Sequence, residues 1–157
     1  MKTYHRNNQT VAHGLKSQKT LGFSLIELLV VVTIIAILSA IAIPVYNNYL
    51  LRAHRSDAIT SITTIALNEE EYRLNNNAYT ATLNDVWQQG TNTEQEFYTL
   101  ALTLLDNNGN PTTDTSNATG FRITATPAGT QANDTECNPI TLSVNSGAVT
   151  KIPEQCW

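Results

Sequence analysis

Apolar residues along the chain follow two patterns, first a continuous run and then a helical repeat. From Phe23 to Val45, every residue except Glu27 is apolar, small or a hydroxyl amino acid. These 23 residues would form a helix of about 35 Å, enough to cross a bilayer core. From Leu51 to Tyr72, apolar residues recur at spacings of 7, 4, 3 and 7, which places them on one helix face. We therefore expect one helix from Phe23 to about Leu74.

Short segments with strand character follow the helix, which we expect to end at Asn75-Asn76-Asn77. The expected strands are Phe97–Leu105, Gly120–Thr126, Ile140–Val144 and Ala148–Ile152. Asn145-Ser146-Gly147 suits a turn between the last two strands. Residues 106–119 read as a polar loop, and residues 83–88 as a short helix. The pattern predicts an α+β fold, in which a small antiparallel sheet packs on the amphipathic half of the long helix.

Charge divides the chain into a basic start and an acidic remainder. The first 22 residues hold four basic side chains and no acid, namely Lys2, Arg6, Lys16 and Lys19. From Pro44 onward, twelve acidic residues stand against five basic ones, a difference of −7. The basic start favours a cytoplasmic N-terminus, although Arg52 and Arg55 soften the asymmetry. An acidic body repels phosphate backbones, so the charge argues against nucleic-acid binding.

The two cysteines, Cys137 and Cys156, both lie near the C-terminus. Outside the cytoplasm they would most simply form one disulfide, closing a loop of about 20 residues worth ~3 kcal/mol. Two unpaired thiols in a cytosolic protein are the alternative, which the membrane-length segment disfavours.

Glu27 is the anomaly of the apolar run, because a charge inside a bilayer costs about 3 kcal/mol. A cleaved signal peptide is one reading, since Ala40-Ile41-Ala42 fits a cleavage site. A plain single-pass anchor is another. Neither reading explains the glutamate.

The segment Gly22-Phe23-Ser24-Leu25-Ile26-Glu27 closely resembles the N-terminal motif of the type IV pilins, together with the basic residues before it. The resemblance implies cleavage between Gly22 and Phe23 by a prepilin peptidase, followed by N-methylation of Phe23. It also implies that Glu27 neutralises the Phe23 amine of another subunit and so sets the register of a filament. Head-to-tail contacts of this kind do not close, so they propagate. The family also has a proline near the position of Pro44, and a proline at this point is expected to kink the helix.

The resemblance implies a type IV pilin fold with three parts. Residues 1–22 are a leader, residues 23–45 a transmembrane and filament-core half-helix, and residues 46–157 a globular head. The head would contain an αβ-loop over about 75–96 and a disulfide region bounded by Cys137 and Cys156. Implied partners are other pilin subunits, the prepilin peptidase and the inner-membrane assembly platform. The protein would lie in the bacterial inner membrane with its N-terminus in the cytoplasm, and in the extracellular pilus after assembly.

Beyond the motif, the stretches "LRAHRSDAITSI", "NNNAYT", "FYTLALT" and "GFRITATPAGTQANDTEC" and the terminal Cys-Trp resemble minor pilins of the PilE type, which are related to the competence pilin ComP. This subgroup implies a minor pilin that primes assembly and enters the fibre, with roles in adhesion and twitching motility. A DNA-receptor pilin is an alternative that the acidic body disfavours. A type II secretion pseudopilin is another, but those proteins commonly lack a C-terminal disulfide.

The sequence offers no catalytic constellation, so we expect a protein that is not an enzyme and needs no cofactor or metal. His54 stands alone among arginines and reads as a solvated helix residue. Glu69-Glu70-Glu71 reads as a solvated face, since adjacent carboxylates fan around a helix. Asp106-Asn107-Asn108-Gly109 reads as a turn and lacks EF-hand spacing.

Overall fold

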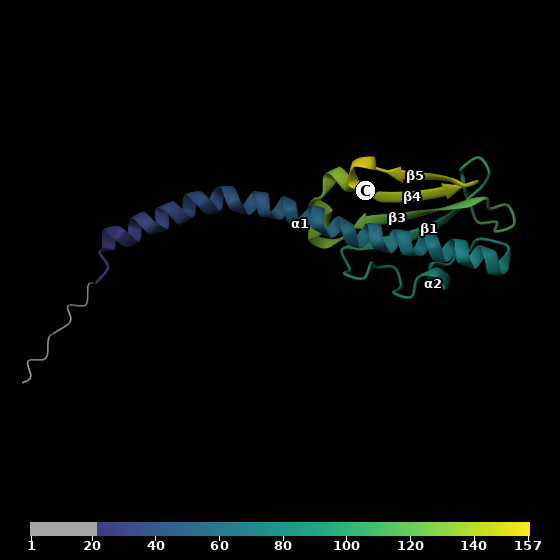
Figure 1. Cartoon of the computed structure of the whole chain (residues 1–157), viewed down its shortest axis with the longest axis horizontal. Helices are drawn as coiled ribbons and strands as arrows, with labels where there is room; N and C mark the ends of the chain where they lie inside the picture. Colours follow the sequence, from purple (N-terminus) through teal and green to yellow (C-terminus); the bar gives the residue numbers. More distant parts are fainter. Residues whose placement is uncertain (1–21) are drawn as a thin grey trace, which may run out of the picture. The chain divides into compact units, whose positions relative to one another are not determined.

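The computed structural model describes residues 22–157; the leader residues 1–21, including Lys16 and Lys19, lie outside them. The chain forms two compact units, one ending at Ala40 and one from Ile41 to Trp157. Helix α1, Leu25–Asn76, contributes to both units (Figure 1). The expected helix is confirmed, and it ends two residues beyond the predicted Leu74.

The described part of the first unit is an apolar helix with nothing packed against it. All apolar side chains from Leu25 to Leu38 are exposed. By length and composition, α1 is able to cross a membrane, and none of its most apolar window is buried. A helix that is apolar on every side is stable only when lipid or protein covers it.

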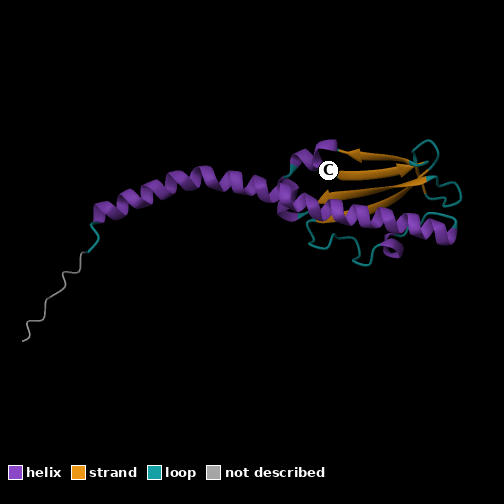
Figure 2. Cartoon of the chain, in the orientation of Figure 1, coloured by secondary structure: helices purple, strands orange, loops and turns teal. Residues whose placement is uncertain are grey.

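The second unit is an α+β head in which a five-stranded antiparallel sheet lies against α1 (Figure 2). Its strand order is β2-β1-β3-β4-β5, and every neighbouring pair is antiparallel. The strands are β1 Tyr98–Leu105, β2 Pro111–Thr112, β3 Gly120–Pro127, β4 Ile140–Asn145 and β5 Ala148–Ile152. A short helix, α2 Leu83–Val86, lies in the segment between α1 and β1.

The head core lies between one face of α1 and one face of the sheet. Ala58, Ile62 and Ile65 of α1 are fully buried, as their helical spacing predicts. They pack with the inward residues of the strands, which in β3 alternate with half-buried or exposed ones. These inward residues include Tyr98, Leu100, Leu104, Phe121, Ile123, Ala125, Ile140 and Leu142.

The four expected strands are confirmed within one or two residues, and β5 matches its expected bounds. The turn at residues 145–147 is also confirmed, with Ser146 and Gly147 at positive φ. Strand β2 was not expected, because residues 106–119 read as a loop. Three short 3-10 helices also went unexpected: η1 Gly129–Asn133, η2 Thr135–Cys137 and η3 Glu154–Cys156.

Position 120, at the start of β3, must be a glycine because the backbone of β4 approaches it closely. A Cβ atom placed there would lie 2.0 Å from the Val144 carbonyl oxygen and 2.6 Å from the Asn145 Cα. Backbone atoms cannot move aside as a flexible side chain would, so only glycine fits at this pairing of β3 with β4.

Candidate functional site

Gly22 and Phe23 lie in an accessible segment that directly precedes α1. Both residues are exposed and non-helical, and the Phe23 side chain is 82 % exposed. Apart from its chain neighbours, none of the described residues has an atom within 4 Å of a Cβ built on Gly22. A cleavage enzyme needs such open backbone, so the geometry is compatible with the expected cut.

Glu27 lies in the first turn of α1, where its carboxylate accepts a hydrogen bond from the Ser24 backbone N–H at 3.4 Å. This is half of a capping box, whose signature is a serine followed three residues later by glutamate. The negative charge also complements the positive end of the helix macrodipole. The S-x-x-E spacing was readable in the sequence, and it gives Glu27 a role within its own chain. Pairing of Glu27 with another subunit stays a prediction.

Pro44 lies inside α1, as expected. Because proline has no N–H, the carbonyl of Ala40 loses its usual helical donor. The expected kink stays a prediction.

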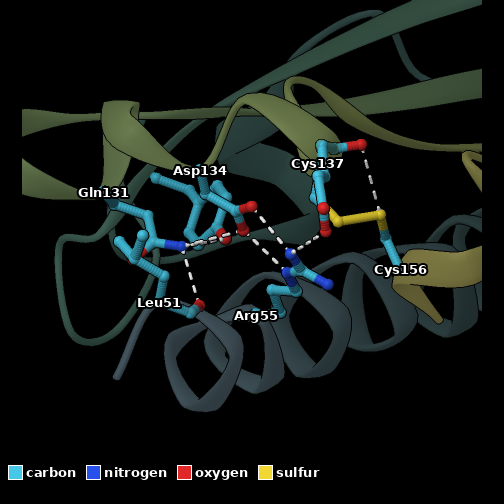
Figure 3. The surroundings of a disulfide bond; sticks show 8 residues. Leu51, Arg55, Gln131, Asp134, Cys137 and Cys156 are labelled. Carbon is cyan, nitrogen blue, oxygen red and sulfur yellow. Dashed lines mark hydrogen bonds and ion pairs between the residues drawn. A yellow bond between two sulfur atoms is a disulfide. The ribbon is translucent and has the colours of Figure 1, made fainter. Parts of the chain in front are cut away.

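A disulfide joins Cys137 and Cys156, with Cα atoms 5.8 Å apart, and Arg55 of α1 forms ion pairs with Asp134 and Glu136, just before Cys137 (Figure 3). Arg55 Nε and Nη2 each donate to one carboxylate oxygen of Asp134, both at 2.7 Å. The Asp134 side chain is only 3 % exposed. A two-pronged contact of this kind fixes both position and orientation, so Arg55 holds the segment that leads into the disulfide region on the helix.

Gln131 of η1 is a fully buried hub next to this ion pair. Its Nε2 donates to the Leu51 carbonyl and to the Tyr98 hydroxyl, both at 2.9 Å. His54 lies 3.1 Å from the Gln131 side-chain oxygen through Nδ1, and its ring stacks on Phe97 at 3.7 Å. The expectation that His54 is a solvated residue is therefore wrong.

The segment between α1 and β1 is also bonded to α1. Buried Asp57 accepts from the Thr93 hydroxyl and from the Gln95 N–H. Asn68 donates to the Val86 carbonyl at 2.8 Å. Glu69 is fully buried and accepts from the Thr80 N–H. Reading residues 69–71 as a solvated face is thus wrong for Glu69.

The Asp106 segment forms the expected turn. The Asp106 carboxylate accepts backbone N–H groups of Asn108 and Asn110 at 2.9 and 2.8 Å. These hydrogen bonds stabilise the ionised form and lower the pKa of Asp106. The carboxylate is occupied by its own loop.

The comparisons with known proteins agree on one family. Residues 18–43 match a prokaryotic N-terminal methylation motif. Residues 44–141 match a family described as "Type IV minor pilin ComP, DNA uptake sequence receptor".

Curated relatives are similar over part of the chain. A fimbrial protein of Neisseria meningitidis serogroup A is 42 % identical over 62 residues, 35 % of this chain and 36 % of its own length. A fimbrial protein of Moraxella nonliquefaciens is 46 % identical over 56 residues, 33 % of this chain and 36 % of its own length. Prepilin peptidase-dependent protein D of Escherichia coli K12 is 61 % identical over 41 residues, 26 % of this chain and 28 % of its own length. The chain thus spans about a third of the length of these relatives.

The methylation motif, the exposed apolar helix and the α+β head belong together with the family match, which covers more than half of the chain. The chain therefore belongs to the type IV pilins, in the family described as "Type IV minor pilin ComP, DNA uptake sequence receptor".

Proposed function

We propose that this protein is a PilE-type minor pilin, held in the bacterial inner membrane, cleaved after Gly22, methylated at Phe23, and built into a type IV pilus. The observation that carries the proposal is the surface of α1. It is apolar all round in its first half, and in its second half one side carries a stripe of mostly exposed residues that includes a single charged side chain. Such a helix is suited to being covered by other helices.

This stripe, which we name the outer seam, repeats at alternating intervals of three and four residues. This spacing keeps its residues along one side of the helix. Eight of its nine residues are exposed and uncharged; the ninth, Glu70, is half-buried and bonded to Tyr79 and Arg73. The outer seam consists of Tyr46, Tyr49, Ala53, Ser56, Thr60, Thr63, Leu67, Glu70 and Leu74.

A charge placed on the outer seam tests this assembly surface. Leu67 is 67 % exposed, so Leu67→Glu should leave the head folded. Burying the new carboxylate against another helix would cost several kcal/mol, so incorporation into pili should fall at least about tenfold. Thr126→Glu is the matched control, because Thr126 is exposed on the sheet face away from α1. Equal amounts of both variants in sheared pili would contradict the proposal.

Cleavage and retention of the helix are tested by intact mass and N-terminal analysis of the membrane-extracted protein. A start at methylated Phe23 supports processing by the peptidase and delivery to the assembly platform. A start at Ile43 would mean that the apolar helix is removed. Deleting the gene separates a pilus role from a secretion role, because loss of twitching with normal exoprotein secretion excludes a pseudopilin.

DNA reception is the second candidate, and the family description favours it. The arrangement of charges on the head argues against DNA binding. Arg55 and Arg73 are paired with acids. Arg122 and Lys151 pair with adjacent residues of β4, Ser143 and Leu142, so they project from opposite faces of the sheet. Arg122 and Lys151 therefore do not share one face of the sheet, and the remaining arginine of the head, Arg52, is exposed on α1.

The full chain in detergent micelles, titrated with labelled double-stranded DNA at low salt, decides between the two. We expect weak binding without sequence preference. Tight binding that weakens steeply with salt would overturn this ranking, because the slope counts the phosphates neutralised. Arg122→Gln and Lys151→Gln would then locate the surface.

A further inference from the structure

Glu69 is a buried carboxyl group in the head half of α1, outside both the proposed membrane-spanning residues 23–45 and the outer seam. Its side chain has no exposed surface. One carboxyl oxygen, Oε2, accepts the Thr80 N–H at 3.3 Å. The other, Oε1, has no hydrogen-bond partner among the residues that the structure describes. An ionised carboxylate would be poorly satisfied in this position, whereas a neutral one would lose far less.

The groups facing Glu69 from the adjoining elements are mainly acidic. Thr80 donates its hydroxyl to Asp85 Oδ2 at 2.7 Å, so Thr80 stands between two carboxyl groups. On α1 itself, Glu70 follows directly and accepts the Tyr79 hydroxyl at 3.0 Å. The nearby cation, Arg73, is paired with Glu70 at 3.2 Å. Its charge is therefore already balanced.

Burial is the main cause that raises the pKa of Glu69 to about 7, and the charges of Glu70 and Asp85 raise it further. The Thr80 N–H lowers it in part. A carboxyl whose pKa is higher in the folded state than in the open state stabilises the closed form at low pH. That stability is fully present below the ordinary pKa of 4.5 and declines as the pH rises toward 7.

We propose that Glu69 is a proton-operated clasp: its neutral form holds residues 77–86 against α1, and its ionised form loosens them. The same residues include Tyr79, which bonds to Glu70 of the outer seam and lines a groove with Leu67. The pH around the head thereby changes the surface beside the seam. The clasp lies within the head and does not depend on the proposed pilus role.

Hydrogen exchange of the full chain in detergent micelles measures the clasp directly. The opening constant of the peptide covering residues 77–86 is obtained after correction for the intrinsic pH dependence of exchange. With carboxyl pKa values of about 7 closed and 4.5 open, the opening constant should rise about 70-fold between pH 5 and pH 8. A constant that stays flat over this range overturns the proposal.

Glu69→Gln removes the titrating group and retains an acceptor for the Thr80 N–H. Its opening constant should lose the 70-fold rise, whereas the exposed-acid control Glu71→Gln should keep it. An unchanged rise in Glu69→Gln would show that another group is responsible.

Infrared spectroscopy of the unsubstituted protein gives a second readout, should Glu69→Gln fail to fold. A protonated-carboxyl band at pH 6 should disappear with a midpoint near pH 7. Absence of that band at pH 6 would equally refute the clasp.

Discussion

Glu27 has two separable roles, a cap of its own helix and a proposed counter-charge for another subunit, and one pair of substitutions distinguishes them. Glu27→Gln keeps the acceptor for the Ser24 N–H, because glutamine also serves in a capping box. It removes the charge. Glu27→Ala removes both the acceptor and the charge. The two variants therefore share the loss of charge and differ only in the cap.

The two roles differ widely in magnitude. The capping hydrogen bond is long, at 3.4 Å, and exposed, so its loss should cost about 0.5–1 kcal/mol. In a helix of 52 residues this leaves the fold intact. An amine left without its counter-charge in a low-dielectric filament core should cost about 3–5 kcal/mol. At about 1.4 kcal/mol per tenfold change, the cap accounts for less than about fivefold in incorporation and the charge for more than about 100-fold.

The assay is the ratio of each variant in sheared pili to the same variant in the membrane fraction, in cells lacking the unsubstituted gene. We expect both variants to be cleaved at Phe23 and to fall more than about 100-fold in this ratio. Glu71→Gln, which removes an exposed acid further along α1, should be unchanged. Near-normal incorporation of Glu27→Gln beside poor incorporation of Glu27→Ala would refute the counter-charge and leave the cap as the role of Glu27.

Three further predictions concern the stability of the head, each measured by denaturant unfolding of the full chain in micelles. Replacing Cys137 and Cys156 by serine should remove about 3 kcal/mol, and reduction of the native protein should have the same effect. Arg55→Met should cost about 3–5 kcal/mol by leaving Asp134 buried and unpaired, and adding Asp134→Asn should restore part of the loss. Gly120→Ala should cost at least about 3 kcal/mol through its clash with β4, and a loss below 1 kcal/mol would contradict the close approach.

The sequence predicted the regular elements well because their periodicities are strong. Ile62 and Ile65 marked the buried face of α1, and the alternation in residues 120–126 marked β3. Strand β2 escaped prediction since it has only two residues, begins with a proline, and is defined by pairing with the end of β1. No local propensity carries that information.

The N-terminal motif could be recognised in the sequence, whereas the polar contacts of the head could not be predicted from it. His54 and Glu69 looked solvated because a helix pattern shows only where apolar residues gather. Segments distant in sequence contact both instead: Gln131 bonds to half-buried His54, and Thr80 bonds to buried Glu69. A prediction from the helix alone has no means of knowing which loops return to cover it.

These contacts also explain how an acidic head retains a surface suited to assembly. Copies of a body with a charge of −7 beyond Pro44 should repel one another. Several of the acids are directed inward: Asp57 and Glu69 bind the segment before β1, and Asp134 is neutralised by Arg55. The outer seam holds a single carboxylate, which is already engaged. Because the outer seam adds only this one engaged carboxylate, we expect charge repulsion to be weak along the side of α1 where another helix is proposed to pack.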